Sequence, residues 1–187
     1  MEILMKIKPI LQGTWFLFLR FILVCALCFM CIPLASFAPA ILPPVIGFFY
    51  GFVLLYFFIF TMWSIGKKDT NLVKTGLAEE NLAKGFISAG ILAVILFLFV
   101  LIPSFLPQSG DASTIVVVLN TVKVVLSMCV NFLVMFFFGN ASPYGTVIVF
   151  AVTMLICTVS AGIGYIVGYR NIPLIEPIIQ KIKKMFQ

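Results

Sequence analysis

The stretch VIGFFYGFVLLYFFIFTMWSI, residues 45–65, decides the fold class of this chain. It contains no charged side chain and consists almost entirely of apolar residues. A transmembrane helix needs about 20 such residues, because each rises about 1.5 Å through a hydrocarbon core about 30 Å thick. The stretch therefore predicts a helix that crosses a lipid bilayer.

Four further segments have the same character, and together they predict an all-α, polytopic transmembrane helix bundle. The five apolar segments cover residues 15–36, 45–65, 86–106, 114–138 and 146–169. Of the 187 residues, 63% are hydrophobic and 10% are charged, whereas a soluble domain has about 25% charged residues. Residues 1–187 are thus expected to form a single membrane domain whose surroundings are the lipid bilayer.

Basic residues border the apolar segments in three groups. These groups are Lys6, Lys8 and Arg20, then Lys67, Lys68, Lys74 and Lys84, then Arg170, Lys181, Lys183 and Lys184. Lys and Arg beside apolar spans mark the cytoplasmic side of a membrane. We therefore expect a multi-pass protein of the cell membrane, with its N-terminus and the hydrophilic loop 66–85 in the cytoplasm. The net charge of +6 reflects this orientation and does not indicate a nucleic-acid partner.

The first apolar segment has two interpretations. A cleavable signal peptide is one, with Ala38-Pro39-Ala40 as the cleavage site. We favour a retained anchor, because the apolar stretch is long enough to fill a membrane. Trp15 and Trp63 then lie at the same depth, as in the aromatic belt of a membrane interface.

The segment 114–138 creates a conflict in the topology. Five crossings from a cytoplasmic N-terminus would leave the basic C-terminal residues outside, against the charge rule. Either residues 114–138 form a broken or re-entrant element, or Lys123 reaches the outer interface and the C-terminus is exterior. Four or five spans are thus open, and we favour the cytoplasmic C-terminus.

The same segment contains the most informative polar residues. Their helical spacing places them along one side: Asn120, Lys123, Ser127 and Asn131. A polar stripe with an ionisable member inside a span is by default a functional hypothesis, so these four residues are a candidate ligand-binding site. The alternative is a Lys whose stem lies in lipid and whose ammonium lies among the headgroups.

Small residues at spacings of four predict close approach between helices. The pairs are Gly47 and Gly51, Ala89 and Ala93, and Gly164 and Gly168. Such pairs let helix backbones touch in lipid. They could build an interface with another membrane protein or a second copy, but we favour packing within the monomer.

The chemistry expected of the chain is limited. Cys25, Cys28 and Cys31 have a spacing used by iron–sulfur proteins, but they lie on a predicted spanning helix, so we interpret them as packing residues. The chain has no His, and no acid–base pair is placed in a pocket by spacing. We expect no enzyme activity, no cofactor and no metal site.

The last residues predict a different kind of helix. Apolar side chains of residues 173–187 share one face, and lysines lie off it. Such a helix lies in the membrane interface and binds anionic lipid.

The stretch WSIGKKDTNLVKTGLAEENLAKGF, residues 63–86, resembles uncharacterised multi-pass membrane proteins of Gram-positive bacteria. This resemblance implies a source and no mechanism. Two functions follow from the sequence. The first is a non-enzymatic accessory or partner-binding subunit that is assembled by small-residue helix packing. The alternative is a small transport subunit or channel with a polar site around Lys123; its size and helix number resemble the substrate-binding components of energy-coupled vitamin importers, which usually have six helices.

Overall fold

A computed structural model describes residues 2–30, 42–77, 80–105, 114–138 and 143–172, and the side chains of 7–30, 45–77, 80–105, 114–127 and 145–172. The described residues form five helices and no strand, which confirms the all-α fold class. The helices are α1 (Glu2–Met30), α3 (Leu42–Lys74), α4 (Lys84–Ser104), α5 (Thr114–Phe138) and α6 (Pro143–Tyr169). The predicted tail helix 173–187 lies outside the described residues.

Two helices are longer than their apolar segments. α1 begins at Glu2 although its apolar segment begins at residue 15, and α3 continues through Lys74, so the first half of the expected loop 66–85 is helical. Apolar composition marks only the part of a helix that fits in lipid. The extension of α1 is helical although it contains Pro9. α3 stops where Gly76 adopts a φ of 71°, and the Leu77 N–H donates to the Leu72 carbonyl at 2.9 Å. This is a Schellman C-cap, which satisfies the last carbonyls of the helix.

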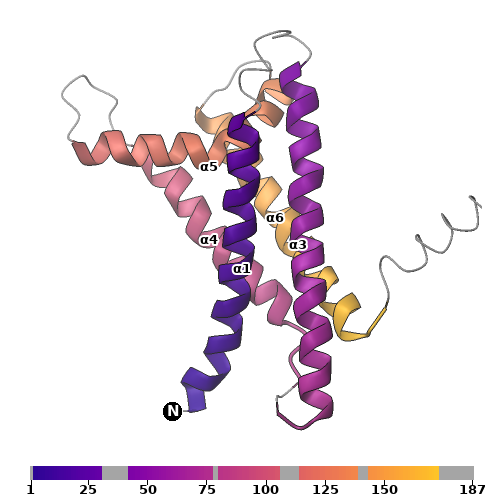
Figure 1. The fold of residues 1–187 in the computed structure, drawn as a ribbon. Coiled ribbons are helices and arrows are strands. Elements are labelled where there is room, and N and C mark those ends of the chain that lie inside the picture. Colours follow the sequence, from indigo (N-terminus) through magenta and orange to yellow (C-terminus); the bar gives the residue numbers. More distant parts are fainter. Residues whose placement is uncertain (1, 31–41, 78–79, 106–113, 139–142, 173–187) are drawn as a thin grey trace, which may run out of the picture.

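Four of the described helices are long and apolar enough to cross a membrane. The spans are Ile7–Met30, Val45–Lys74, Lys84–Ser104 and Gly145–Tyr169. α5 is different, because it lies crosswise to the long axes of α1 and α3 (Figure 1). Which of the two topologies left open by the sequence applies to residues 114–138 stays a prediction.

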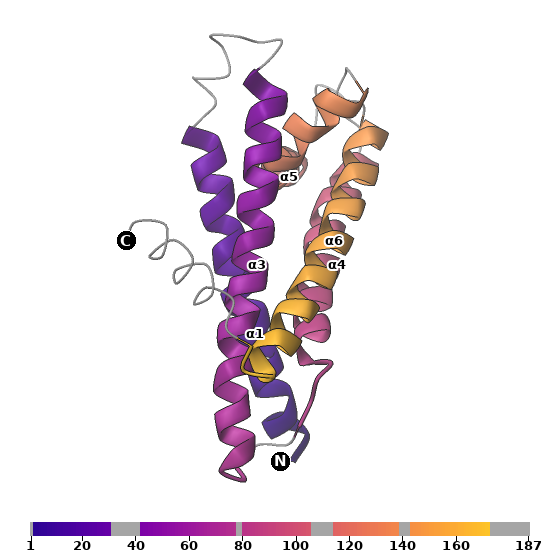
Figure 2. The same cartoon turned by 90° about the vertical axis from the view of Figure 1, so that its right-hand side faces the viewer.

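In the view of Figure 2 the four spans lie as two pairs, α1 beside α3 and α4 beside α6, and the most extensive contact between helices joins α3 to α6 across the pairs. Figure 2 shows the pairs meeting near the start of α1 and separating toward the other end, where α5 lies between them. The start of α1, the end of α3, the start of α4 and the end of α6 share the first of these ends, which we call the basic end. It carries a set of basic residues: Lys8, Lys67, Lys68, Lys74, Lys84 and Arg170. α6 thus ends on the side where α1 begins.

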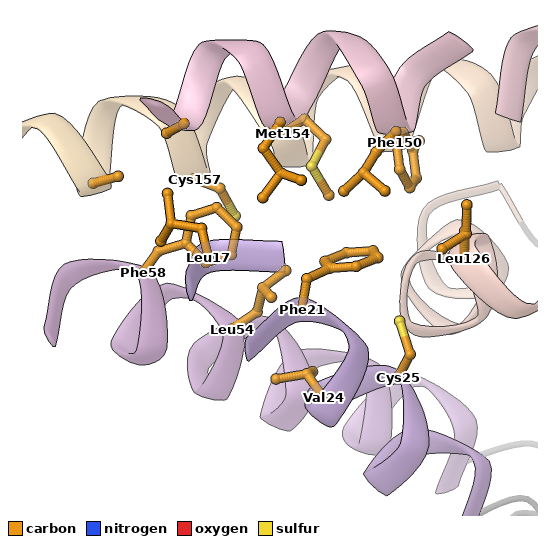
Figure 3. Close-up of a cluster of buried hydrophobic side chains, with 14 of the residues drawn as sticks. Leu17, Phe21, Val24, Cys25, Leu54, Phe58, Leu126, Phe150, Met154 and Cys157 are labelled. Carbon is orange, nitrogen blue, oxygen red and sulfur yellow. The ribbon is translucent and has the colours of Figure 1, made fainter. Parts of the chain in front are cut away.

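An apolar core joins the two pairs. Side chains of α1, α3 and α6 point toward one another in Figure 3, and Leu126 of α5 lies beside Cys25 and Phe21. Phe21, Phe58 and Phe150 are at most 1% exposed. Lipid is as apolar as these side chains, so their contribution to stability comes from dispersion contacts in the tightly packed interior.

Candidate functional site

The predicted polar set on α5 is only partly gathered. Ser127 is buried, and its Oγ donates a hydrogen bond to the carbonyl of Lys123 at 2.7 Å. Asn120 and Lys123 are half-buried on the same side of the helix. The side chain of Asn131 lies outside the described residues. Three of the four residues therefore follow the side of α5 that faces the bundle, as their spacing predicts.

The ammonium of Lys123 takes part in none of the hydrogen bonds or ion pairs found among the described side chains. Beside α5 there is a cavity of about 340 Å³, but Lys123 does not line it. Its walls come from α1, α4 and α5 and are almost wholly apolar: Phe18, Ile22, Ile95, Leu96, Phe99, Thr121, Val122, Val125 and Leu126. This cavity can hold an apolar group and offers no recognition to a polar solute.

Gly164 and Gly168 of the small-residue set pack within the monomer. A Cβ at Gly168 would lie 2.1 Å from the carbonyl oxygen of Trp63, and one at Gly164 would lie 2.5 Å from that of Ile59. The backbones of α3 and α6 therefore touch through these glycines, since no side chain could fit between them. On α4, Ala89 is 1% exposed and Ala93 packs against the core.

Gly47 and Gly51, the remaining pair of small residues, lie near the start of α3, at the end of the bundle opposite the basic end. Gly47 is buried and Gly51 is half-buried. Their burial is compatible with packing inside the bundle, and the contact that each backbone makes stays a prediction.

A second polar cluster, whose residues stand far apart in the sequence, lies at the basic end. The Lys84 ammonium donates to the Asp69 carboxylate at 2.5 Å, and the Tyr165 hydroxyl donates to the same oxygen at 2.8 Å. The side chains of Lys84 and Asp69 are only 9% and 15% exposed. One carboxylate thus joins the end of α3, the start of α4 and the last turns of α6.

Hydroxyl groups add further bonds between helices near this cluster. Thr70 donates to the Tyr169 carbonyl at 2.5 Å, which links α3 to α6. Between α1 and α4, the Thr14 Oγ1 lies 3.1 Å from the Ser88 carbonyl, and the Ser88 Oγ donates to the Ile10 carbonyl at the same distance. Gly13 makes this approach possible, because a Cβ there would lie 2.9 Å from the Ser88 Oγ. All four spans are therefore tied together at the basic end.

This cluster joins three helices. The Lys84 ammonium and the Tyr165 hydroxyl both donate to the Asp69 carboxylate, so the negative charge of Asp69 is compensated within the protein. The sequence signal for it was weak. Asp69 stands directly after two lysines at the end of one apolar segment, and Lys84 stands just before the next, so their opposite charges at one interface were a clue. Tyr165, 96 residues from Asp69, has no local signal.

Two other sequence features have clear places. Cys25 and Cys28 are buried in the core, and Cys31 lies outside the described residues. Arg20 is an exposed charge within the first span, and its guanidinium carbon lies 5.4 Å from the ring centre of Phe57. Such a cation–π contact contributes about 0.5–2 kcal/mol.

No protein-family model, curated protein or solved structure matches this chain. Its function is therefore inferred from its own residues.

Proposed function

We propose that this small integral membrane protein is a non-enzymatic accessory subunit that binds another membrane protein. The observation that supports this function is the first half of α5, which extends sideways beyond α1 and α4 (Figure 1). Ile115 is 71% exposed there, and Val117 is 56% exposed. Gly66 of α3 and Gly164 and Gly168 of α6 are occupied within the monomer, so a partner cannot pack against these three glycines.

The extension of α5 has suitable physical properties for such a contact. Residues 114–118 read TIVVV, and β-branched side chains are stiff, so little rotamer entropy is lost when a second helix packs against them. Contacts between helices in lipid depend on this kind of close dispersion packing. The crosswise direction of α5 presents the surface away from the four spans.

Photo-cross-linking in cells tests this function. A photoreactive amino acid at Val117 should give a discrete protein adduct, whereas the same group at Val152 of α6 should not. The two positions are a matched pair, because both are valines and their exposed fractions are 56% and 52%. Lipid adducts alone at both positions, together with a monomer in mild detergent, would contradict the proposal.

The alternative, a transport subunit or channel, is supported by the depth of Lys123. Its neighbour Val122 shares a cavity with Ile22, which lies seven residues beyond Trp15, or about 10 Å along the helix. If Trp15 marks the interface, Lys123 lies well inside a hydrocarbon core about 30 Å thick. A Lys at such depth is a candidate for binding an anionic group.

Lys123→Met tests the alternative. Under the transport function this variant inserts and folds normally but loses solute binding or flux in a metabolite-uptake screen. Wild-type behaviour of the variant would remove the chemical basis for transport and leave the accessory function.

A further inference from the structure

The apolar cavity between α1, α4 and α5 forms a groove with defined boundaries. α5 closes it toward the opposite end, through Val122 and Leu126. Toward the basic end α1 and α4 converge, because Thr14 and Ser88 are hydrogen-bonded. The groove volume of about 340 Å³ falls in the range of small-molecule sites, about 300–1,000 Å³. The groove is therefore large enough for a ligand and is short along the membrane normal.

One side of α1 leads from the basic end into this groove. Its residues recur at spacings of three and four, which places them on one helix face. They are Lys8, Leu11, Trp15, Phe18 and Ile22. Lys8, Leu11 and Trp15 are exposed, and Phe18 and Ile22 line the groove. From the basic end inward, this face of α1 thus presents the cation of Lys8, then the aromatic ring of Trp15, and then the apolar groove.

We propose that this face and groove form a binding site for one anionic phospholipid. The phosphate lies against the Lys8 ammonium, Trp15 lies at the interface, and the end of one acyl chain fills the groove beneath α5. Lys8 and Ile22 are fourteen residues apart on α1, which is about 21 Å of helix. That length matches one leaflet, about 20 Å from midplane to headgroups.

The shape of the groove favours an acyl chain over a transmembrane helix. A partner helix must continue for about 20 residues to cross the bilayer, but α5 extends across its path above the groove (Figure 1). An acyl chain is thin and flexible and ends within the membrane, so it can stop under α5. The apolar lining suits a hydrocarbon chain, and the charge of Lys8 suits an anionic headgroup.

Fluorescence quenching measures occupancy of this site. In the Trp63→Phe background, Trp15 is the sole tryptophan of a chain that contains two. The full chain is reconstituted in phosphatidylcholine bilayers that contain a minor fraction of chain-brominated lipid. We expect brominated phosphatidylglycerol to quench Trp15 several-fold more effectively than brominated phosphatidylcholine at the same mole fraction. Equal quenching by the two lipids would overturn the proposal.

Matched variants separate the groove from the membrane surface. Val125→Phe fills the groove and should abolish the excess quenching, whereas Val124→Phe, at an exposed position outside the groove, should leave it intact. Ile95→Phe fills the groove from α4 and serves as a second test should Val125→Phe fail to fold. Excess quenching that persists in the filled variants, or that is also lost in Val124→Phe, contradicts the site.

The headgroup contact is tested in the same assay. Lys8→Gln should weaken the preference for phosphatidylglycerol about fivefold, the equivalent of the ~1 kcal/mol that one basic residue contributes near an anionic surface. Lys68→Gln, at an exposed lysine of the same end on α3, should leave the preference unchanged. Equal losses in both variants would show general surface attraction and overturn a specific site. A change of oligomeric mass in Val125→Phe without a change in quenching would assign the groove to a second copy instead.

Discussion

The two ends of the bundle are held together by different kinds of contact. At the basic end, α3 and α6 touch through glycines, and Asp69 joins Lys84 to Tyr165. Toward the opposite end the pairs separate around α5 (Figure 2), where apolar side chains of the core pack together and the Tyr50 hydroxyl donates a hydrogen bond to the Leu27 carbonyl at 2.9 Å. Among the described residues, the basic end thus combines close backbone contact with a charged cluster, whereas the end that holds α5 is packed around an apolar core.

This difference between the two ends follows from the lipid that surrounds the helices. In lipid an apolar side chain gains little by leaving the hydrocarbon, so apolar packing alone specifies an arrangement weakly. Backbone contact at glycines and hydrogen bonds between helices are directional, and they select one geometry. The basic end therefore serves as the fixed base of the molecule, and the half that holds α5 is where binding surfaces are expected.

Gly168→Ala should have the largest effect on stability. The new Cβ would lie 2.1 Å from the backbone carbonyl oxygen of Trp63, which cannot move aside without separating α3 from α6. We expect a loss of more than about 4 kcal/mol, or no folded protein. Gly90→Ala is the matched control, because a Cβ there meets nothing within 4 Å and should stabilise α4 by about 0.5–1 kcal/mol. Unfolding in mild detergent compares them, and equal stabilities would show that the helices do not touch at Gly168.

Lys84→Met should come next. It leaves the Asp69 carboxylate at the helix junction without its counter-charge, and breaking a buried pair in this way costs about 3 kcal/mol. Lys68→Met, at an exposed lysine, is the control and should change little. Adding Asp69→Asn to Lys84→Met should restore part of the loss, since the uncompensated charge is then gone. A single variant as stable as wild type would mean that the cluster does not hold the basic end.

The same substitution, Tyr→Phe, can be made at both ends. Tyr165→Phe removes a hydrogen bond to a charged group and should cost about 2 kcal/mol, whereas Tyr50→Phe removes one to a carbonyl and should cost about 1 kcal/mol. Thermal unfolding in one detergent measures both. The reverse order of effects would contradict the view that the basic end is the more strongly fastened.

Val125→Phe and Val124→Phe should have the smallest effect. Both positions on α5 are exposed, at 42% and 56%, so the added atoms meet the groove or the surroundings and not the core. We expect each unfolding free energy to stay within about 0.5 kcal/mol of wild type. A large loss in either variant would show that α5 is packed as tightly as the basic end.

The sequence predicted the helices better than it predicted their contacts. The limits of α5, residues 114–138, and the end of α6 at residue 169 agree with the structure, because charges, Gly and Pro border the apolar runs. The apolar pattern did not predict the start of α1 or the end of α3, because these two extensions are helical without being apolar. Of the candidate site, Asn120, Lys123 and Ser127 share one side of α5 as their spacing requires, yet none of the three lines the cavity beside α5.

The sequence alone determined that the chain belongs in a lipid bilayer and how many apolar helices it has. It also determined that α5 contains polar residues that are unusual in an apolar helix. Length and hydropathy are local properties, and each helix satisfies its backbone hydrogen bonds internally. Only the tertiary structure decided that α5 lies crosswise, because residues 114–138 are as apolar and as long as the helices that cross. The tertiary structure also decided which basic residue pairs with Asp69. Lys84 and Tyr165 both donate to the Asp69 carboxylate, and they can do so only because three helix ends meet at one point. That meeting is set by backbone contacts at Gly164 and Gly168, which a glycine spacing suggests and only the packed helices can place.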